Sequence, residues 1–378
     1  MIQVFSFVMF LLLLLYGTLF MYFRRGWLSL SEEKTKKDYI PKTFVSIIVP
    51  ARNEAQNIQK LINDILEQIY PSDLMEIIIV DDHSTDDTAK IIQSFKEVRY
   101  ISLNDFIGNQ VLNAYKKKAI EVGIKQAKGT LIITTDADCR LDKFWLLSVA
   151  QHYETKREKL IASPVVFEDS SNWFQIFQSI DFFTMQGITG ALSFFNSGSM
   201  CNGANLAYTK TVFETVKGFE GIDNVASGDD MLLMYKIEQH YPQQTTYLKN
   251  KNAIVTTQGM KTFLSFFQQR IRWASKSKQF KDKNLIFILS FIFFFNFTFI
   301  LLGFLSIFNS QFIHLLWSSF IVKIGIELLL LIPVSRFFNK SKELIYFIPL
   351  QIIHIPYIVI SAILSLFVKY QWKERTVQ

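Results

Sequence analysis

Two carboxylates stand one residue apart at the end of an apolar, β-branched run. Residues 130–135 read Thr-Leu-Ile-Ile-Thr-Thr, and Asp136 and Asp138 follow on either side of Ala137. Such a run is typical of a strand in a buried parallel sheet, and ligands of open α/β folds bind at the carboxyl ends of such strands. Carboxylates placed there can hold a hard divalent cation, which often accompanies a diphosphate. The pair therefore indicates a metal-assisted site, although isolated Asp-x-Asp sequences also occur in solvated turns.

Polar residues also follow two earlier apolar runs. The first run leads into Pro50, Asn53 and Glu54, and the second into Asp81 and Asp82. An aspartate at a strand end can accept a hydrogen bond from a ribose hydroxyl or a base imide. The alternative is a simple turn followed by a helix cap.

A lysine triplet, residues 116–118, precedes the strand that ends in the two carboxylates. Such a triplet is ordinarily a solvated helix face, but one lysine near the sheet edge would be able to meet a phosphate.

An acidic pair and a small-residue stretch lie in the second half of the chain. Asp229 and Asp230 precede a helix expected over residues 231–239, so they suit either a general base with a neighbouring acid or an N-cap. The small-residue stretch leaves room for close approach of a ligand, and it consists of Gly203, Ala204 and Asn205.

Short apolar runs alternate with amphipathic helices between these motifs. This alternation predicts an α/β fold with a mostly parallel sheet covered by helices. Strands are expected over residues 45–50, 75–80, 98–103 and 130–135, and helices over 57–68, 88–95, 113–127, 171–195 and 260–280.

Long apolar segments at both ends predict membrane spans. Residues 2–23 are uncharged and long enough to cross a hydrocarbon core of about 30 Å, and basic residues follow them, which favours an anchor over a cleaved signal peptide. Three further spans are expected near residues 285–308, 312–334 and 344–368, with Lys323 and Glu327 neutralising each other inside the bundle.

Composition excludes several classes of protein. The net charge is +7 and 50% of residues are hydrophobic, but the basic residues cluster beside apolar segments, which favours juxtamembrane charge over a nucleic-acid surface. The two cysteines are too few for a disulfide framework, and the five histidines show no zinc-site spacing.

The expected organisation has six parts. They are an N-terminal anchor (1–25), a linker (26–43), a cytosolic catalytic domain (44–258), an amphipathic interfacial helix (259–283), a C-terminal membrane region (284–370) and a tail (371–378).

The ordered strand-end motifs together resemble the nucleotide-sugar half of a family 2 glycosyltransferase with a GT-A fold. The resemblance rests on residues 45–54, 81–86, 118–119 and 136–138. It implies a nucleoside-diphosphate sugar donor, often UDP-linked, with Mg²⁺ or Mn²⁺ between Asp138 and the diphosphate. The donor would be bound by Pro50, Asn53, Glu54, Asp81, Asp82, Lys118 and Asp136. His83 stands where the family commonly has a small residue.

Two further motifs extend the resemblance. Gly203, Ala204 and Asn205 resemble the family's small-residue loop on the donor side. Asp229 and Asp230 resemble its Glu-Asp motif, with Asp230 in the position of the catalytic base.

Gln269, Arg272 and Trp273 resemble the Gln-x-x-Arg-Trp motif of membrane-integrated members. On a helix they share one face, where they would meet the leaving diphosphate and the acceptor. The alternative is an interfacial helix with aromatic residues at the lipid boundary.

These observations predict an inverting glycosyltransferase of the cell envelope, integral to the plasma (inner) membrane, that uses a lipid or glycan acceptor. The Gln-x-x-Arg-Trp resemblance keeps open a processive polysaccharide synthase, but four spans are few for enclosing a polymer channel. A catalytically silent or regulatory membrane protein on the same scaffold is a further alternative.

Overall fold

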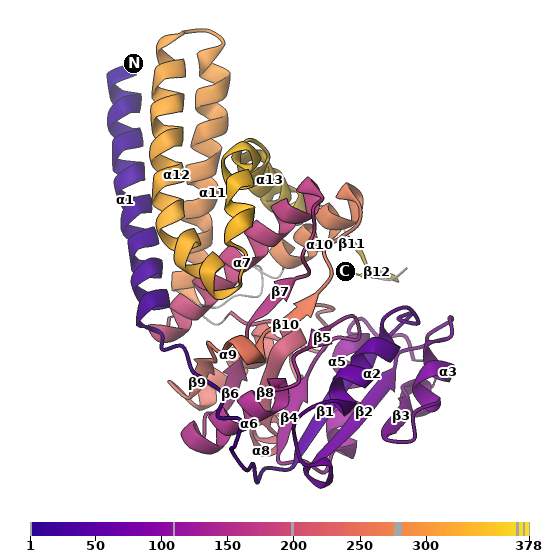
Figure 1. The fold of residues 1–378 in the computed structure, drawn as a ribbon. Helices are drawn as coiled ribbons and strands as arrows, with labels where there is room; N and C mark the ends of the chain where they lie inside the picture. The colour runs from indigo at the N-terminus through magenta and orange to yellow at the C-terminus, as the bar shows by residue number, and fades with distance from the viewer. Residues whose placement is uncertain are drawn as a thin grey trace. The chain divides into compact units, whose positions relative to one another are not determined.

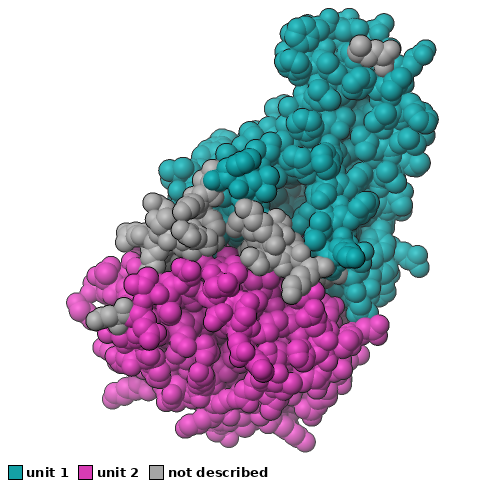
Figure 2. Space-filling model, turned by 180° about the vertical axis from the view of Figure 1, so that it is seen from behind, with its two compact units in different colours: residues 1–30, 169–198, 259–370 teal, residues 31–168, 199–258, 371–378 magenta. Residues whose placement is uncertain are grey.

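A computed structural model describes residues 2–108, 110–197, 200–275, 282–367, 370–372 and 375–377. Residues 276–281 of the expected interfacial helix and part of the expected tail therefore lie outside the described residues. The chain divides into two compact units, coloured separately in Figure 2. Unit 1 comprises residues 1–30, 169–198 and 259–370, and unit 2 comprises residues 31–168, 199–258 and 371–378.

This division corrects the expected continuous catalytic domain over residues 44–258. Residues 169–198 leave it and join unit 1, because their helix packs along the N-terminal helix and a C-terminal one. Residues 26–30 of the expected linker continue unit 1, and residues 31–43 join unit 2: Tyr39 donates to Glu154 at 2.6 Å, and the Glu33 amide donates to the Lys249 carbonyl at 2.8 Å.

Unit 2 is built on a mixed, mostly parallel sheet of seven strands (Figure 1) in the order β3-β2-β1-β4-β8-β6-β9. Only β8 runs against its neighbours, β4 and β6. The strands are β1 (Val45–Ala51), β2 (Met75–Asp81), β3 (Val98–Ser102), β4 (Leu131–Thr134), β6 (Leu160–Ala162), β8 (Leu206–Thr209) and β9 (Thr245–Tyr247).

Because β8 is antiparallel, its first residue lies at the edge where β4 ends. Leu206 of β8 is in register with Thr134 of β4, and the Thr134 hydroxyl donates to the Gly203 carbonyl at 3.0 Å. This single reversal brings the small-residue stretch to the edge that carries Asp136 and Asp138.

A smaller sheet has the order β5-β10-β7. Its strands are β5 (Arg140–Leu141), β7 (Val165–Phe167) and β10 (Val255–Thr257). β10 runs parallel to β7 and antiparallel to β5. A final short pair is formed by β11 (Tyr370–Trp372) and β12 (Arg375–Val377).

Helices cover the main sheet, as the alternation of elements predicts. Helix α5 packs on β1 and β2, and it approaches closely at Gly123, where an added Cβ would lie 2.7 Å from the Ile48 side chain. The helices of unit 2 are α2 (Ile58–Leu66), α3 (Thr88–Gln93), α4 (Asn104–Ile107), α5 (Tyr115–Gln126), α6 (Trp145–Lys156), α8 (Lys210–Thr215) and α9 (Met231–His240), with 3₁₀ turns at Ser72–Leu74, Gly203–Asn205 and Lys251–Ala253.

Unit 1 is helical. Its elements are α1 (Ile2–Ser29), α7 (Trp173–Phe194), α10 (Phe263–Ser275), α11 (Lys283–Ser306), α12 (Gln311–Phe337), the 3₁₀ helix η5 (Ser341–Tyr346) and α13 (Phe347–Phe367). Helices α1, α12 and α11 lie side by side, and α10 packs on α13 (Figure 1). Among the described residues, four segments are long and apolar enough to cross a membrane: Ile2–Ser29, Lys283–Ser306, Gln311–Phe337 and Ser341–Phe367.

The expected pair inside the bundle is confirmed. Lys323 donates to Glu327 at 2.7 Å and to Gln351 at 2.7 Å, and the Tyr16 hydroxyl donates to the same Glu327 oxygen at 2.5 Å. Lys323 is fully buried and Glu327 is 4% exposed, so each charge is neutralised within the bundle.

Candidate functional site

The turns that follow β1 and β2 are joined by hydrogen bonds. The Asn53 amide donates to the Ser84 hydroxyl at 3.0 Å, and the Thr85 amide donates to the Asn53 side chain at 2.8 Å. Arg52 Nη1 donates to the carbonyl oxygens of Asp82 at 2.9 Å and His83 at 3.2 Å. The two turns thus form one rigid rim at the carboxyl edge of the sheet.

Asp81 and Asp82 are both buried at this rim. Asp81 is 6% exposed, and its Oδ1 atom has no hydrogen-bond partner among the described residues. Burial raises the pKa of Asp81 above its usual value, although hydrogen bonds from Ser84 oppose the shift. Because an unpaired buried carboxylate oxygen is costly, Asp81 is suited to receive a hydrogen-bond donor from a ligand. Asp82 Oδ1 lies 2.9 Å from His83 Nδ1.

Pro50 and Glu54 lie on the same rim. Pro50 is half-buried in β1, opposite Val80 of β2. The Glu54 amide donates to the Thr88 hydroxyl at 2.8 Å, while its carboxylate accepts from the Asn57 side chain at 2.8 Å.

A lysine joins two of the carboxylates at the sheet edge. Lys116 Nζ lies 2.8 Å from Asp136 Oδ1 and 3.0 Å from Asp229 Oδ2. Burial alone would lower the pKa of Lys116, but the charges of Asp136 and Asp229 outweigh it and raise that pKa. Lys116 therefore stays protonated, and it brings together residues separated by more than 90 positions in the chain.

Lys118, which the sequence suggested, lies apart from this cluster. Its ammonium pairs with Glu121 of the same helix at 3.3 Å. Helix α5 leaves the carboxyl edge of the sheet after β3 and returns to the amino edge before β4, so its first turn is nearest the site. Both lysines lie in this first turn, but residues two positions apart on a helix point in directions about 200° apart, and Lys116 is the one that faces the carboxylates.

Asp230 lies beside the cluster at the start of α9. Its Oδ1 accepts from the Met231 amide at 2.7 Å, and its Oδ2 accepts from the Gly203 amide at 3.3 Å. It is therefore a helix cap, as the alternative interpretation held, and it also faces the small-residue stretch. A Cβ added to Gly203 would lie 2.9 Å from Asp229 Oδ2, so a larger residue there would displace the acidic pair.

Ala204 and Asn205 have internal roles. Ala204 is 3% exposed, and its amide donates to Asn202 at 3.0 Å. The Asn205 side chain is 1% exposed, accepts from Trp145 Nε1 at 3.0 Å and donates to the carbonyls of Pro164 and Ala253, each at 2.8 Å. These bonds engage both ends of its amide, so Asn205 positions the loop.

Asp138 points toward the smaller sheet. Its Oδ2 accepts from the Thr257 hydroxyl at 3.3 Å, and its Oδ1 lies 3.9 Å from Cys139 Sγ. Burial raises the pKa of the Cys139 thiol well above its usual value, so the thiol is protonated and a poor metal ligand. No group of three or more His, Cys, Asp or Glu residues with metal-binding geometry occurs in the described part of the chain. A cation held by Asp138 would therefore need further oxygen ligands from a bound substrate and water.

The Gln-x-x-Arg-Trp residues belong to unit 1. Gln269, Arg272 and Trp273 are partly buried on α10. The residue between them, Arg270, was not singled out from the sequence, yet it is 3% exposed and its guanidinium lies 4.2 Å from the centre of the Trp273 ring.

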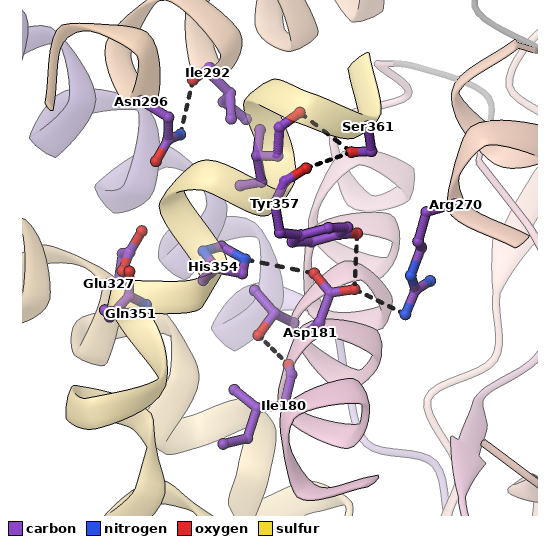
Figure 3. A network of polar contacts seen from close by, with 12 residues as sticks. Ile180, Asp181, Arg270, Ile292, Asn296, Glu327, Gln351, His354, Tyr357 and Ser361 are labelled. Atoms are coloured by element: carbon purple, nitrogen blue, oxygen red, sulfur yellow. Dashed lines mark hydrogen bonds and ion pairs between the residues drawn. The ribbon is translucent and has the colours of Figure 1, made fainter. Parts of the chain in front are cut away.

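Arg270 belongs to a buried polar network that links α7, α10 and α13 (Figure 3). Its Nη2 lies 2.9 Å from Asp181 Oδ2. The Tyr357 hydroxyl donates to Asp181 at 3.4 Å, and His354 Nε2 lies 3.5 Å from its other oxygen. Local sequence carries no signal for this network, because its members lie in three distant segments.

Part of unit 2 and of α7 matches a known protein family, whereas the acidic pair and the Gln-x-x-Arg-Trp residues lie beyond the matched stretch. Residues 46–217 match the model described as "Glycosyl transferase family 2". Glycosyltransferase AglE of Haloferax volcanii is 36% identical over 103 residues, which are 27% of this chain and 33% of that protein. Probable glycosyltransferase YdaM of Bacillus subtilis is 26% identical over 332 residues, 81% of this chain and 74% of that protein. This chain thus spans only a third of AglE but most of YdaM.

A solved structure shows the same fold. The mannosyltransferase PcManGT from Pyrobaculum calidifontis, in complex with GDP-Man and Mn²⁺, has a TM-score of 0.59 at 16% identity, covering 97% of this chain and 99% of that one. Unit 2 has the GT-A fold expected from the sequence. The family match and the relatives support a family 2 glycosyltransferase.

Proposed function

We propose that this chain is an inverting, metal-dependent glycosyltransferase that moves a sugar from a UDP-linked donor onto a lipid or lipid-linked acceptor. The observation that carries the proposal is the cluster at the sheet edge, where Lys116 joins Asp136 to Asp229 beside Asp230. The four candidate spans of unit 1 support a membrane-bound acceptor. The basic residues after the first span support a plasma (inner) membrane protein with unit 2 in the cytosol.

Each residue of the cluster has a proposed task. Asp230 takes the proton of the acceptor hydroxyl as that oxygen bonds to the anomeric carbon, while the bond from this carbon to the diphosphate breaks and the configuration inverts. Asp136 contacts the donor sugar or ribose, and Asp81 and Asp82 contact the nucleoside with Pro50, Asn53 and Glu54.

Asp138 is the residue that would hold Mg²⁺ or Mn²⁺, because its carboxylate oxygens suit a hard cation. When bound, the cation would offset the negative charge of the leaving diphosphate. Gln269, Arg272 and Trp273 are proposed to serve the diphosphate and the acceptor.

Donor screening tests this function. Purified protein in detergent, supplied with UDP- and GDP-linked sugars and a lipid extract, is expected to release free nucleoside diphosphate with Mn²⁺ or Mg²⁺ and to stop when EDTA is added. Release that continues unchanged in EDTA would contradict metal dependence. Absence of release with every donor would support a catalytically silent protein.

The Gln269-x-x-Arg272-Trp273 sequence also favours a second candidate, a processive polysaccharide synthase. Product length separates the two. A lipid acceptor predicts a short glycolipid product, and a long polymer made without added lipid would contradict our preference.

Replacing each of the two lysines by glutamine, in separate variants, tests which of them serves the site. Lys116→Gln is expected to lower turnover by about 10- to 100-fold, because two charge-assisted contacts worth about 1.5–3 kcal/mol are lost. Lys118→Gln is the matched control, and its initial rate should stay within about twofold because its partner is the surface residue Glu121. Equal losses in the two variants would remove Lys116 from its proposed role.

A further inference from the structure

His83 adopts a backbone conformation that is uncommon for residues other than glycine. Its φ is 56°, in the left-handed region that glycine enters most easily. Residues other than glycine persist there when the surrounding structure holds them, often at functional sites. The imidazole at this position therefore calls for an explanation beyond the turn itself.

The turn does not need the imidazole in order to form. Arg52 holds the carbonyl oxygens of Asp82 and His83, and the Asn53 amide holds the Ser84 hydroxyl at 3.0 Å. None of these bonds uses the side chain of residue 83, so a glycine at this position would retain all of them.

The imidazole is held in one orientation by two neighbours. Its Nδ1 lies 2.9 Å from Asp82 Oδ1, and Asp82 is 2% exposed. Its ring meets Tyr115 edge to face, with centroids 5.8 Å apart and planes at 87°. An ionised carboxylate only accepts, so Nδ1 carries the proton in the neutral ring and Nε2 keeps its lone pair.

His83 also lies near the proposed donor site. Tyr115, which its ring meets, directly precedes Lys116, whose ammonium contacts Asp136 and Asp229. On the strand side, Asp81 ends β2 two residues earlier and carries the unpartnered Oδ1 atom. About 30% of the His83 side chain is exposed, so it remains accessible to a ligand.

We propose that His83 is a specificity-determining residue for the donor, whose Nε2 accepts a hydrogen bond from the nucleoside. The inference rests on the proposed function, since it requires a nucleoside-diphosphate donor. The hydrogen on the ligand belongs either to the ribose 2′-hydroxyl or to a base N–H, and both present the same donor chemistry to Nε2.

Replacing His83 by glycine separates recognition from folding. His83→Gly relieves the left-handed backbone but removes the contact with Asp82, so its thermal midpoint should stay within a few degrees of that of the wild type. The Kd for UDP, measured by calorimetry with Mn²⁺ present, should rise by about tenfold, the effect of losing one hydrogen bond worth about 1.4 kcal/mol. His83→Asn, which also tolerates this conformation but has a shorter side chain, should show a similar loss.

Titrations with 2′-deoxy-UDP and GDP identify the ligand group. If the ribose hydroxyl donates, 2′-deoxy-UDP binds the wild type weakly and is insensitive to His83→Gly. If the base donates, the ratio of UDP to GDP affinity changes instead.

Gln243→Gly is the matched control. Gln243 is exposed and has a φ of 62°, and it precedes β9 at the amino edge of the sheet, opposite the site. This variant should relieve the same kind of backbone strain without changing the Kd. Unchanged nucleotide affinity in a folded His83→Gly protein would overturn the inference, whereas a wild type that binds none of the three nucleotides would overturn the proposed function itself.

Discussion

Replacing Asp230 by asparagine is expected to remove transfer while leaving metal-dependent binding of UDP intact. Turnover should fall by about 10²- to 10⁴-fold, the range that a general base contributes. Asparagine has nearly the same shape and is also a good N-cap, so α9 should still begin at Met231. The rate of nucleoside diphosphate release and the Kd for UDP with Mn²⁺ measure the two properties separately.

Asp282→Asn provides a matched control for this experiment. Asp282 caps α11 by accepting from the amides of Asn284 at 2.8 Å and Leu285 at 3.2 Å, but it belongs to none of the motifs. Its turnover should match that of the wild type. Unchanged turnover in Asp230→Asn would rule out Asp230 as the base, and a joint loss of turnover and UDP binding would indicate a role in assembling the site.

Asp181→Asn should produce the largest loss of stability. The variant leaves the Arg270 guanidinium buried without its counter-ion, and breaking a buried pair in this way costs about 3–5 kcal/mol. Burial alone would raise the pKa of Asp181, but Arg270 lowers it, so the pair contributes at neutral pH and is lost as the pH falls through that lowered pKa. Thermal unfolding in detergent should show a midpoint several degrees lower.

Asp169→Asn is the control that tests whether the burial of the ion pair determines the loss of stability. Asp169 also pairs with a lysine, Lys340, in the same unit, but 93% of its side chain is exposed. Its removal should change stability by no more than about 0.5 kcal/mol. Removing both charges with Asp181→Asn and Arg270→Gln should recover part of the loss, because no unpaired charge remains. Equal midpoints for Asp181→Asn and Asp169→Asn would contradict this account of the network.

The pattern of hydrophobic residues in the sequence was sufficient to predict the strands near the site. The expected strands over residues 45–50 and 75–80 agree with β1 (Val45–Ala51) and β2 (Met75–Asp81) to within one residue. Each combines a short, continuous apolar run with an abrupt polar end. That combination is typical of a buried strand in a parallel sheet. The four apolar spans were predictable for the same reason, since length and hydropathy alone define them.

Side-chain partners and unit boundaries were less predictable. The choice between Lys116 and Lys118 depends on which face of α5 turns toward the carboxylates, and that rotation is set by tertiary packing. Helix α7 is apolar along much of its length, so its sequence does not say which unit it joins. Asp181 and Arg270 lie on separate helices, and their contact arises only from tertiary packing.

The contact between Tyr16 and Glu327 has a consequence for biosynthesis. These residues are 311 positions apart, so ribosomes working at about 5–20 residues per second need roughly 15–60 s between them. During that interval α1 is already made, but the helix that supplies its polar partner has not left the ribosome. The nascent chain must therefore keep an incomplete bundle from misassembling while unit 2 folds, and premature termination before α12 would leave α1 without its carboxylate.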